Sequence, residues 1–319
     1  MAQTIVPARF TTRSIDGVDI AGFEWRCDSR GDPCFRPVVV ICAATAVRCR
    51  YYARFAAFLC RNGFDVLTFD YRGIGESRPH CLRGFRAGWG DWGLYDVDAV
   101  LRYAQTGFPS QPVYAVGHSI GGFAIGLAPL NHILKHVVTV GAQFAYWRDY
   151  EKVSRWRMFL KWHVVMPVLS HSFGYFPGAR LGWLEDVPHH VVRDWSRMGP
   201  AFEHSLSSPV SAGQLRQNFA TMSGKLLAIG LTDDPFGTVA AVDRLLGYYQ
   251  GASRTHLRVA PDDIGTADIG HFAFFHDRFE TSLWPIALAW LRDGVLPADA
   301  PGNVVMNIVP EHNLTVGVG

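Results

Sequence analysis

The sequence has almost no excess of charge of either sign and no long apolar run. Its 30 basic and 28 acidic residues leave a formal charge of +2, too small to hold nucleic acid electrostatically. No segment approaches the roughly 20 apolar residues that cross a bilayer, and the opening MAQTIVPARF lacks the basic and apolar parts of a secretory signal. We therefore expect a globular, cytoplasmic protein without a nucleic-acid partner.

Patterns typical of disulfide frameworks and metal sites are also missing. The six cysteines lie between Cys27 and Cys81 without a C-x-x-C pair, which predicts mostly buried, reduced thiols. Cys42 lies inside the apolar run VVVICAA and is expected to be a core residue rather than a nucleophile. His189, His190 and the scattered carboxylates show no metal-ligand spacing. We expect no metal and no cofactor.

Most of the chain alternates between apolar runs and segments of helical periodicity. A hairpin around Asp16-Gly17 comes first. The later apolar runs are VVVICAA (38–44), FDVLTFD (64–70), VYAVG (113–117), VVTVGA (137–142), KLLAIGL (225–231) and THLRVA (255–260). Continuous apolar strands separated by helices are typical of a parallel sheet covered on both faces.

One long interruption divides this pattern. Residues 143–212 are rich in Trp, Phe, His and Pro and exceed an ordinary connection between a strand and a helix. We expect them to form a helical cap between two parts of a core, residues 1–142 and 213–292. Residues 293–319 are punctuated by Gly, Pro and Asn and predict an extended tail with little regular structure.

The stretch AVGHSIGG, residues 115–122, contains the motif G-x-S-x-G between an apolar strand and a helical segment. In this motif the serine occupies a sharp turn, and the glycines avoid collisions with neighbouring backbone. Glycine and serine are common in turns, so the five residues alone are weak evidence. The strand before them and the helix after them favour Ser119 as a nucleophile.

A serine nucleophile needs a general base and an acid that orients the base. His271, in ADIGHFAFF, follows the last apolar run and is the expected base, whereas His276 beside charged residues resembles a solvated turn. The loop LTDD places two adjacent carboxylates after the strand at 225–231. We assign the acid to Asp233; the alternative, Asp234, could instead cap the following helix.

The oxyanion of such a reaction is usually held by two backbone N–H groups. Ile120 supplies one by its position after the serine, and Thr45, between Ala44 and Ala46 in a loop of small residues, is the expected second donor. The residues expected to line a substrate pocket are Ala44, Ala46, His118, Trp147, Trp156, Phe159 and Phe272.

The segment YEKVSRWRMFLKWHVVMPVL, residues 150–169, is apolar on more than one helical face. Such a helix is usually buried on both sides, and part of its surface could line an acyl or aromatic pocket. The basic residues among its tryptophans could touch anionic lipid, but they are typical of a solvated rim, so membrane contact is not expected. No charged group for specificity is evident, which favours small, uncharged or weakly polar esters with an apolar part.

Several markers together resemble those of the α/β-hydrolase superfamily, in particular its monoacylglycerol lipase-like and serine aminopeptidase-like branch. They are FDYRGIGES, WGLYDVDAVL, GHSIGG, LTDD and IGHFAFF, and YWRD, GYFPGARLG and DPFGT are similar to a group of uncharacterised bacterial hydrolases. The resemblance implies a mostly parallel, eight-stranded sheet with helices on both faces and a helical cap. Ala43-Ala44 departs from the His-Gly of many relatives.

The motif and the resemblance together predict a serine hydrolase that cleaves a carboxylic ester through an acyl-enzyme. Because a fold does not determine chemistry, three alternatives stay open. They are an acyltransferase, a cofactor-free lyase or oxygenase that uses the same residues, and a catalytically silent ligand-binding module. A dinucleotide site is not among them, because Gly73 and Gly75 are followed by Arg78 where the fingerprint needs a third glycine.

Overall fold

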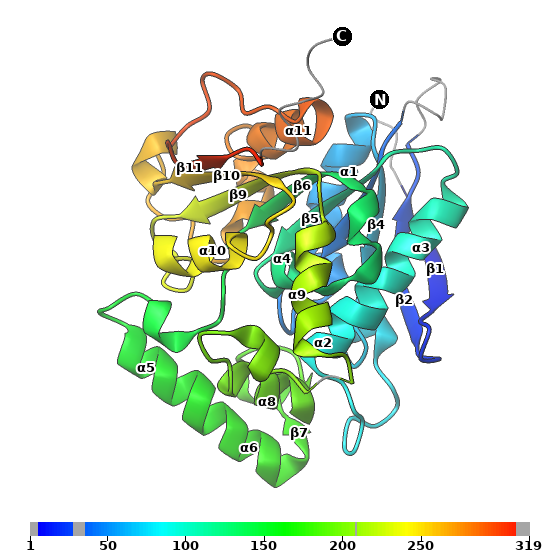
Figure 1. The fold of residues 1–319 in the computed structure, drawn as a ribbon, viewed down its shortest axis with the longest axis vertical. Coiled ribbons are helices and arrows are strands. Elements are labelled where there is room, and N and C mark those ends of the chain that lie inside the picture. Colours follow the sequence, from blue (N-terminus) through cyan, green and yellow to red (C-terminus); the bar gives the residue numbers. More distant parts are fainter. Residues whose placement is uncertain (1–5, 28–35, 208, 311–319) are drawn as a thin grey trace.

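A nine-stranded sheet forms the centre of the computed structural model, which describes residues 6–27, 36–207 and 209–310 (Figure 1). Its strands are β1 (Ala8–Arg13), β2 (Asp19–Trp25), β3 (Val38–Cys42), β4 (Asp65–Phe69), β5 (Val113–His118), β6 (Leu134–Val140), β9 (Lys225–Leu231), β10 (Ser253–Val259) and β11 (Asn303–Ile308). The spatial order is β1-β2-β4-β3-β5-β6-β9-β10-β11. All pairs from β4 to β10 in this order are parallel, and the outer pairs are antiparallel. The predicted α/β class with a mostly parallel sheet is confirmed.

The predicted number of eight strands was wrong, because β11 comes from the segment that was expected to have little regular structure. β11 pairs antiparallel with β10 at the edge of the sheet. Most of its side chains are exposed, so it lacks the apolar burial by which strands are recognised in a sequence. Backbone pairing with β10 provides its order instead. The remainder of the predicted tail, residues 311–319, lies outside the described residues.

Helices cover both faces of the sheet. They are α1 (Ala53–Arg61), α2 (Trp89–Asp91), α3 (Asp98–Gly107), α4 (Ile120–Leu127), α9 (Ala212–Thr221), α10 (Val239–Leu246) and α11 (Trp284–Asp293), and a π-helical stretch, Trp92–Val97, joins α2 to α3. The chain moves from β3 to β4 in one direction and from β4 to β5 in the other, so right-handed crossovers place α1 and α3 on opposite faces. Trp284 of α11 packs on Phe55 of α1, with ring centroids 5.2 Å apart.

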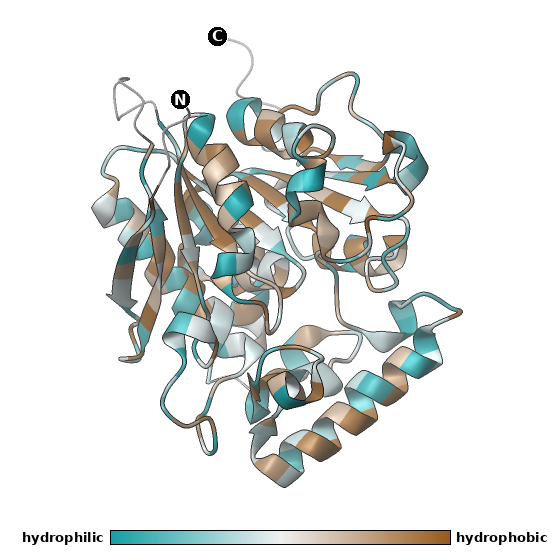
Figure 2. Cartoon of the chain, turned by 180° about the vertical axis from the view of Figure 1, so that it is seen from behind, coloured by the Kyte–Doolittle hydropathy of each residue, from teal (hydrophilic) through white to brown (hydrophobic). Residues whose placement is uncertain are grey.

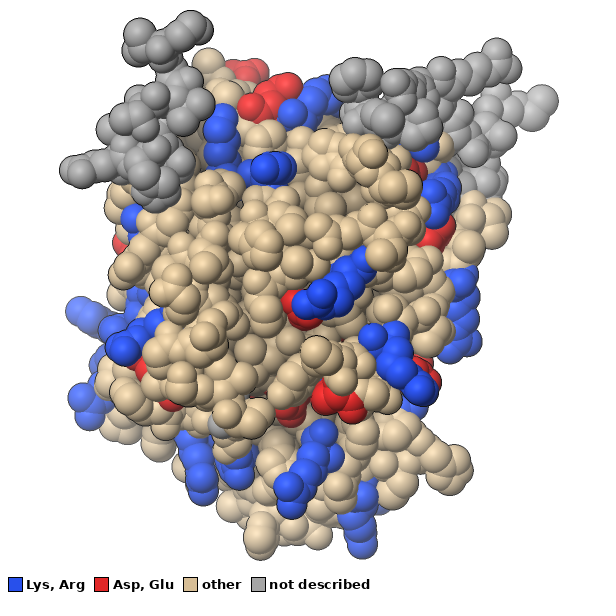
Figure 3. Space-filling view, turned by 45° about the vertical axis from the view of Figure 1, so that its right-hand side comes forward, with Lys and Arg blue, Asp and Glu red and all other residues tan. Residues whose placement is uncertain are grey.

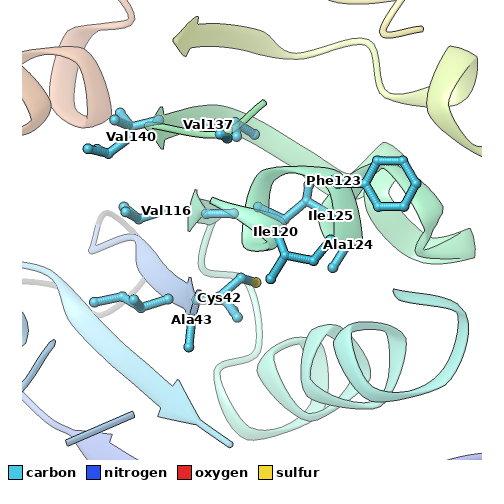
Figure 4. Packing of buried hydrophobic residues seen from close by; sticks show 14 of the residues in the cluster. Cys42, Ala43, Val116, Ile120, Phe123, Ala124, Ile125, Val137 and Val140 are labelled. Atoms are coloured by element: carbon cyan, nitrogen blue, oxygen red, sulfur yellow. The ribbon is translucent and has the colours of Figure 1, made fainter. Parts of the chain in front are cut away.

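The strands that carry the site are buried on both faces. Every residue of β3 and β5 is buried, and Figure 4 shows Val116 of β5 near Ile120 at the start of α4. Cys42 is part of the same cluster and is fully buried, which raises the pKa of its thiol well above its ordinary value. This is the environment of a core residue, as predicted.

Between β6 and β9 the chain forms an inserted segment, residues 141–224, most of which lies at the lower end of the molecule in Figure 1, whereas its last helix, α9, lies beside the sheet. Besides α9 it contains α5 (Arg155–Phe159), α6 (Met166–Phe173), α7 (Gly178–Leu181), α8 (His189–Ser196) and the strand pair β7 (Tyr175–Phe176) and β8 (Val187–Pro188). A π-helical stretch, Leu160–Val165, joins α5 to α6. The predicted division into core, cap and tail stays a prediction.

The helix that runs from α5 to α6 is not buried on both sides, contrary to our expectation. Its inner side is buried at Met158, Trp162 and Met166. Its outer side is exposed, with fractions of 66%, 55%, 39% and 60% at Trp156, Leu160, Val164 and Val168. Figure 2 shows brown hydrophobic bands alternating with teal hydrophilic ones along this helix. Periodicity shows which residues share a face of a helix but not whether a second layer covers that face.

The distribution of surface charge is relevant to nucleic-acid binding, and the length and polarity of the helices are relevant to membrane insertion. On the face drawn in Figure 3, basic and acidic side chains are interspersed among uncharged ones. A nucleic-acid interface requires basic side chains gathered on one face, and the lack of such a partner stays a prediction. Within the part of the chain that the structure describes, every helix is too short or too polar to cross a bilayer.

Candidate active site

Ser119 occupies a strained turn between β5 and α4. Its φ of 54° and ψ of −120° lie outside the regions that non-glycine residues favour, at a cost of about 1–3 kcal/mol. A Cβ on Gly117 would lie 2.6 Å from the nitrogen of Gly122, and one on Gly121 would lie 2.2 Å from the carbonyl oxygen of Cys42. Both glycines are therefore required by the close approach of α4 to the strands.

His271 lies against this turn, although 152 residues separate it from Ser119. Its Nε2 is 2.9 Å from Ser119 Oγ, within hydrogen-bond distance. The histidine belongs to the loop after β10, directly behind Gly270, whose φ of 63° is left-handed. The side chain of His271 is only 8% exposed. The structure thus brings together the two residues that the sequence pairs as nucleophile and base.

The acid assigned from the sequence was wrong by one position. Asp234 Oδ2 lies 2.7 Å from His271 Nδ1, and the side chain of Asp234 is fully buried. Asp233 instead accepts hydrogen bonds from the backbone N–H groups of Ile269 and Gly270, both at 2.8 Å. Adjacent side chains leave the backbone in different directions, so only one of the two carboxylates reaches the imidazole. Asp233 holds the backbone that precedes His271.

The surroundings of Asp234 favour its ionised form. Burial alone would raise the pKa of this carboxyl group. The hydrogen bond of His271 and the positive charge of its imidazolium form, together with the N–H groups of Phe236 and Gly237, outweigh burial and lower the pKa of Asp234 below its ordinary value. An ionised Asp234 accepts the Nδ1–H of His271 and leaves Nε2 free to accept a proton from Ser119.

A buried chain of hydrogen bonds, called the relay below, lies behind Ser119 and connects the loop after β3, the end of β5 and the loop after β10. His118 Nε2 lies 2.8 Å from the carbonyl oxygen of His271, and because a carbonyl only accepts, this nitrogen carries the proton. His118 Nδ1 therefore accepts from the hydroxyl of Tyr52 at 2.7 Å, and that hydroxyl accepts from the N–H of Ala44 at 2.9 Å. Burial, reinforced by the charge of His271, lowers the pKa of His118 to about 3, so its ring is neutral.

The hydrogen bonds of the relay show which backbone N–H groups are free to bind an oxyanion. The N–H of Ala44 is occupied by Tyr52. Thr45 donates its N–H to no described residue, and Ile120, as the first residue of α4, has no carbonyl within the helix to bond. Thr45 and Ile120 line the same cavity as Ser119 and His271. These two N–H groups are the ones available to stabilise negative charge there.

The cavity has a volume of about 250 Å³ and lies between the sheet and the inserted segment. Of the residues predicted for the pocket, Ala44 and Phe272 line it. Its lining also includes Trp162, Trp183 and Trp195 of the inserted segment. Across the described ranges, no group of three or more His, Cys, Asp or Glu side chains gathers as metal ligands.

A family model described as serine aminopeptidase, S33, matches residues 33–194, slightly more than half of the chain. The chain belongs to this family. The predicted membership of the α/β-hydrolase superfamily is thereby confirmed. The matched region contains Ser119 and ends before Asp234 and His271, so the family model itself does not assign the base or the acid.

Solved structures share the family fold over most of the chain. An esterase from Pyrococcus furiosus is 16% identical, covers 90% of this chain and 92% of its own, and has a TM-score of 0.56. An esterase from Exiguobacterium antarcticum is 14% identical, with coverages of 89% and 99% and a TM-score of 0.55. A hypothetical protein from Pseudomonas aeruginosa is 13% identical, with coverages of 92% and 95% and a TM-score of 0.60. A search of curated proteins finds no match.

Five residues predicted for the pocket of this hydrolase fold lie elsewhere, so the prediction was wrong for them. Ala46 is buried in a turn with a φ of 59°, and His118 is buried behind Ser119. The rings of Trp147, Trp156 and Phe159 pack on one another, with centroids 4.7 to 6.0 Å apart, and do not line the cavity. They form a cluster on the inserted segment that helical periodicity alone could not orient.

The sequence analysis missed an aromatic wall and a charged group. Trp89, Trp195 and Trp162 follow one another along the cavity, with successive ring centroids 5.6 and 4.8 Å apart. Lys161 also lines the cavity, which contradicts the expectation of a pocket without a charged group for specificity. The abundance of tryptophan in residues 143–212 was a sequence signal for Trp162 and Trp195, but not for Trp89, which lies outside this segment.

Replacing Tyr52 by phenylalanine is expected to lower the free energy of unfolding by about 1–3 kcal/mol, because it leaves the buried N–H of Ala44 and Nδ1 of His118 unpaired. The control is Tyr51→Phe, which removes one hydrogen bond to the carbonyl of Phe272 at a more exposed position. Urea denaturation of both variants measures the difference. Equal stabilities would contradict the relay.

Proposed function

We propose that the chain is a serine hydrolase that cleaves small carboxylic esters through an acyl-enzyme. The observation that carries the proposal is the chain of contacts from Ser119 Oγ to His271 Nε2, at 2.9 Å, and from His271 Nδ1 to Asp234, at 2.7 Å. Ser119 and His271 line one cavity and Asp234 is buried beside it, so nucleophile, base and orienting acid lie in sequence within hydrogen-bond reach, which is the arrangement that acyl transfer needs.

In the first half-reaction, Ser119 Oγ attacks the ester carbonyl carbon while His271 Nε2 takes its proton. The N–H groups of Ile120 and Thr45 hold the resulting oxyanion, and Asp234 stabilises the imidazolium. The C–O bond to the alcohol then breaks, and His271 returns the proton to the leaving oxygen. In the second half-reaction, water attacks the acyl-enzyme, and the same proton transfers release the carboxylic acid and restore Ser119.

The composition of the cavity favours esters over the free amino termini that an aminopeptidase binds. An α-ammonium group requires a carboxylate or several carbonyl oxygens for its charge. Among the described residues that line this cavity there is no aspartate or glutamate, whereas Lys161 adds a positive charge. We therefore propose an ester as the substrate, although the family model is described as a serine aminopeptidase.

The size of the cavity sets the expected substrate. A volume of about 250 Å³ lies just below the usual range of about 300–1,000 Å³ for ligand pockets. In the proposal the inserted segment acts as a cap, because Trp162, Trp183 and Trp195 close the side of the cavity opposite the sheet. Short esters are expected to fit, and long acyl chains are expected to be turned over slowly.

A fluorophosphonate probe tests the proposal. We expect the wild-type chain to take up one label per molecule, measured by intact mass, and the variant Ser119→Ala to take up none. p-Nitrophenyl esters of increasing chain length then measure turnover, with a maximum expected at short chains. A folded wild-type chain that takes no label would point to a silent ligand-binding module, and labelling without ester turnover would favour an acyltransferase or a lyase.

A further inference from the structure

Lys161 brings a positive charge into the wall of the catalytic cavity. Its Nζ lies 4.4 Å from the ring centroid of Trp162 and 4.4 Å from that of Trp183. Among the described residues it forms neither an ion pair nor a hydrogen bond. Each ring attracts the ammonium group by about 0.5–2 kcal/mol. The rings offer no oxygen or nitrogen acceptor for a hydrogen bond from its three N–H groups.

A second cavity continues from the first along the same helix. It has a volume of about 360 Å³ and shares Lys161, Trp162 and Phe236 with the catalytic cavity. Arg157 lines this second cavity and has no acidic partner among the described residues. Lys161 therefore lies at the boundary between a cavity that holds Ser119 and one that carries a further cation.

The negative charge that would balance these cations is absent from the surrounding chain. Residues 152–184 include five lysine or arginine residues and neither aspartate nor glutamate. Asp149 and Glu185, near the two ends of this stretch, pair with Arg244 and Arg48, and the exposed Glu151 accepts a hydrogen bond from Ser154 rather than from Lys161 or Arg157. An anion that enters the cavity would meet an unpaired ammonium group in a partly desolvated site, where attraction is stronger than in water.

Two further polar groups in the wall lack partners. Gln143 is 8% exposed and Trp89 is 2% exposed, and both line the catalytic cavity. Gln143 Oε1 and Trp89 Nε1 make no hydrogen bond within the described part of the chain. A buried polar group without a partner costs about 1–3 kcal/mol. Both atoms are themselves buried, so a molecule in the cavity would not supply their missing partners, and the substrate inference rests on Lys161.

We propose that the preferred substrate is an ester that carries a carboxylate remote from the scissile bond, with Lys161 as the group that binds this carboxylate. The inference rests on the proposed ester hydrolysis at Ser119. Of the described lysine and arginine residues, Lys161 alone lines the catalytic cavity, and Arg157 lines only the second one, so a single ammonium group there balances the single charge of a carboxylate rather than that of a phosphate dianion. A half-ester of a dicarboxylic acid has this chemistry.

The test compares two esters of similar length, mono-p-nitrophenyl glutarate and p-nitrophenyl pentanoate. We expect the wild-type chain to prefer the anionic ester in kcat/KM by about 10- to 100-fold, the range of a charged hydrogen bond. In Lys161→Met the ratio of the two kcat/KM values is expected to fall toward one, mainly through KM of the anionic ester, and in Lys161→Arg it is expected to be largely restored.

The matched control is Lys152→Met, which removes an equal charge from the same segment at an exposed position outside both cavities. It is expected to keep the wild-type ratio, so a general effect of net charge is separated from binding at Lys161. A ratio near one in the wild-type chain, with both esters hydrolysed by Ser119, would overturn the carboxylate proposal and leave the proposed function intact.

A binding measurement keeps the inference testable if no ester is turned over. Calorimetry on Ser119→Ala should detect mono-p-nitrophenyl glutarate and lose this binding when Lys161→Met is added. Binding that depends on Lys161 without turnover would support the anion site and overturn the hydrolase proposal. Binding that does not depend on Lys161, or tighter binding of the corresponding phosphonate than of the carboxylate, would overturn the assignment.

Discussion

Replacing Ser119 by alanine is expected to lower kcat for p-nitrophenyl ester hydrolysis by about 10⁴- to 10⁶-fold. Among the described residues, the Ser119 hydroxyl is the only hydrogen-bond partner of His271 Nε2, so no other side chain is placed to form the acyl-enzyme in this geometry. Residual turnover would come from the oxyanion donors Ile120 and Thr45, which stay in place. Burst kinetics with p-nitrophenyl acetate measure the loss of the acylation step directly.

The same substitution is expected to leave the stability of the fold almost unchanged. Ser119 Oγ makes no cap hydrogen bond to α4, and alanine fits the space that the serine leaves. The strained backbone is also retained, because Gly117 and Gly121 still allow the close approach of helix and strands. Thermal unfolding should therefore match the wild-type chain. A folded Ser119→Ala variant that keeps more than about a tenth of the wild-type activity would contradict the assignment of Ser119 as the nucleophile.

The nucleophile and base could be predicted because local chain geometry determines their positions. The turn at Ser119 needs a strand before it, a helix after it and glycines on either side, and all of these are visible in AVGHSIGG. The parallel strands end at one edge of the sheet, so loops that follow β5, β9 and β10 meet there. His271 could be placed at that edge because it follows the serine and the acidic loop in the chain order expected of this fold.

The acid and the pocket walls depend on side-chain direction and on a second layer, which sequence patterns do not contain. Asp233 and Asp234 are neighbours in one loop, and only the loop's path decides which reaches His271. Trp162 lines the cavity and Trp156 faces solvent, although both lie on the same helix. Helical periodicity assigns them to different faces, but it does not say which face covers Ser119.

The neighbouring carboxylates after β9 permit a matched comparison. Asp234→Asn is expected to lower kcat by about 10⁴-fold, the loss typical when the orienting carboxylate of a triad becomes an amide. The amide NH₂ would donate to His271 Nδ1 and leave the proton on Nε2, which then faces Ser119 Oγ and cannot accept its proton. The imidazolium would also lose its buried counter-charge.

The same change one residue earlier should act differently. In Asp233→Asn the amide oxygen can still accept from the N–H groups of Ile269 and Gly270, so we expect less than about a tenfold loss of kcat, since no charge-dependent step uses this group. Steady-state kinetics on the two variants, with circular dichroism to confirm folding, give the comparison. If Asp233→Asn caused the larger loss, the loop after β9 would have to present Asp233 to the imidazole during catalysis, and the assignment of Asp234 would be overturned. Equal small losses would show that His271 needs no carboxylate, because the backbone held by Asp233 would then orient the ring by itself.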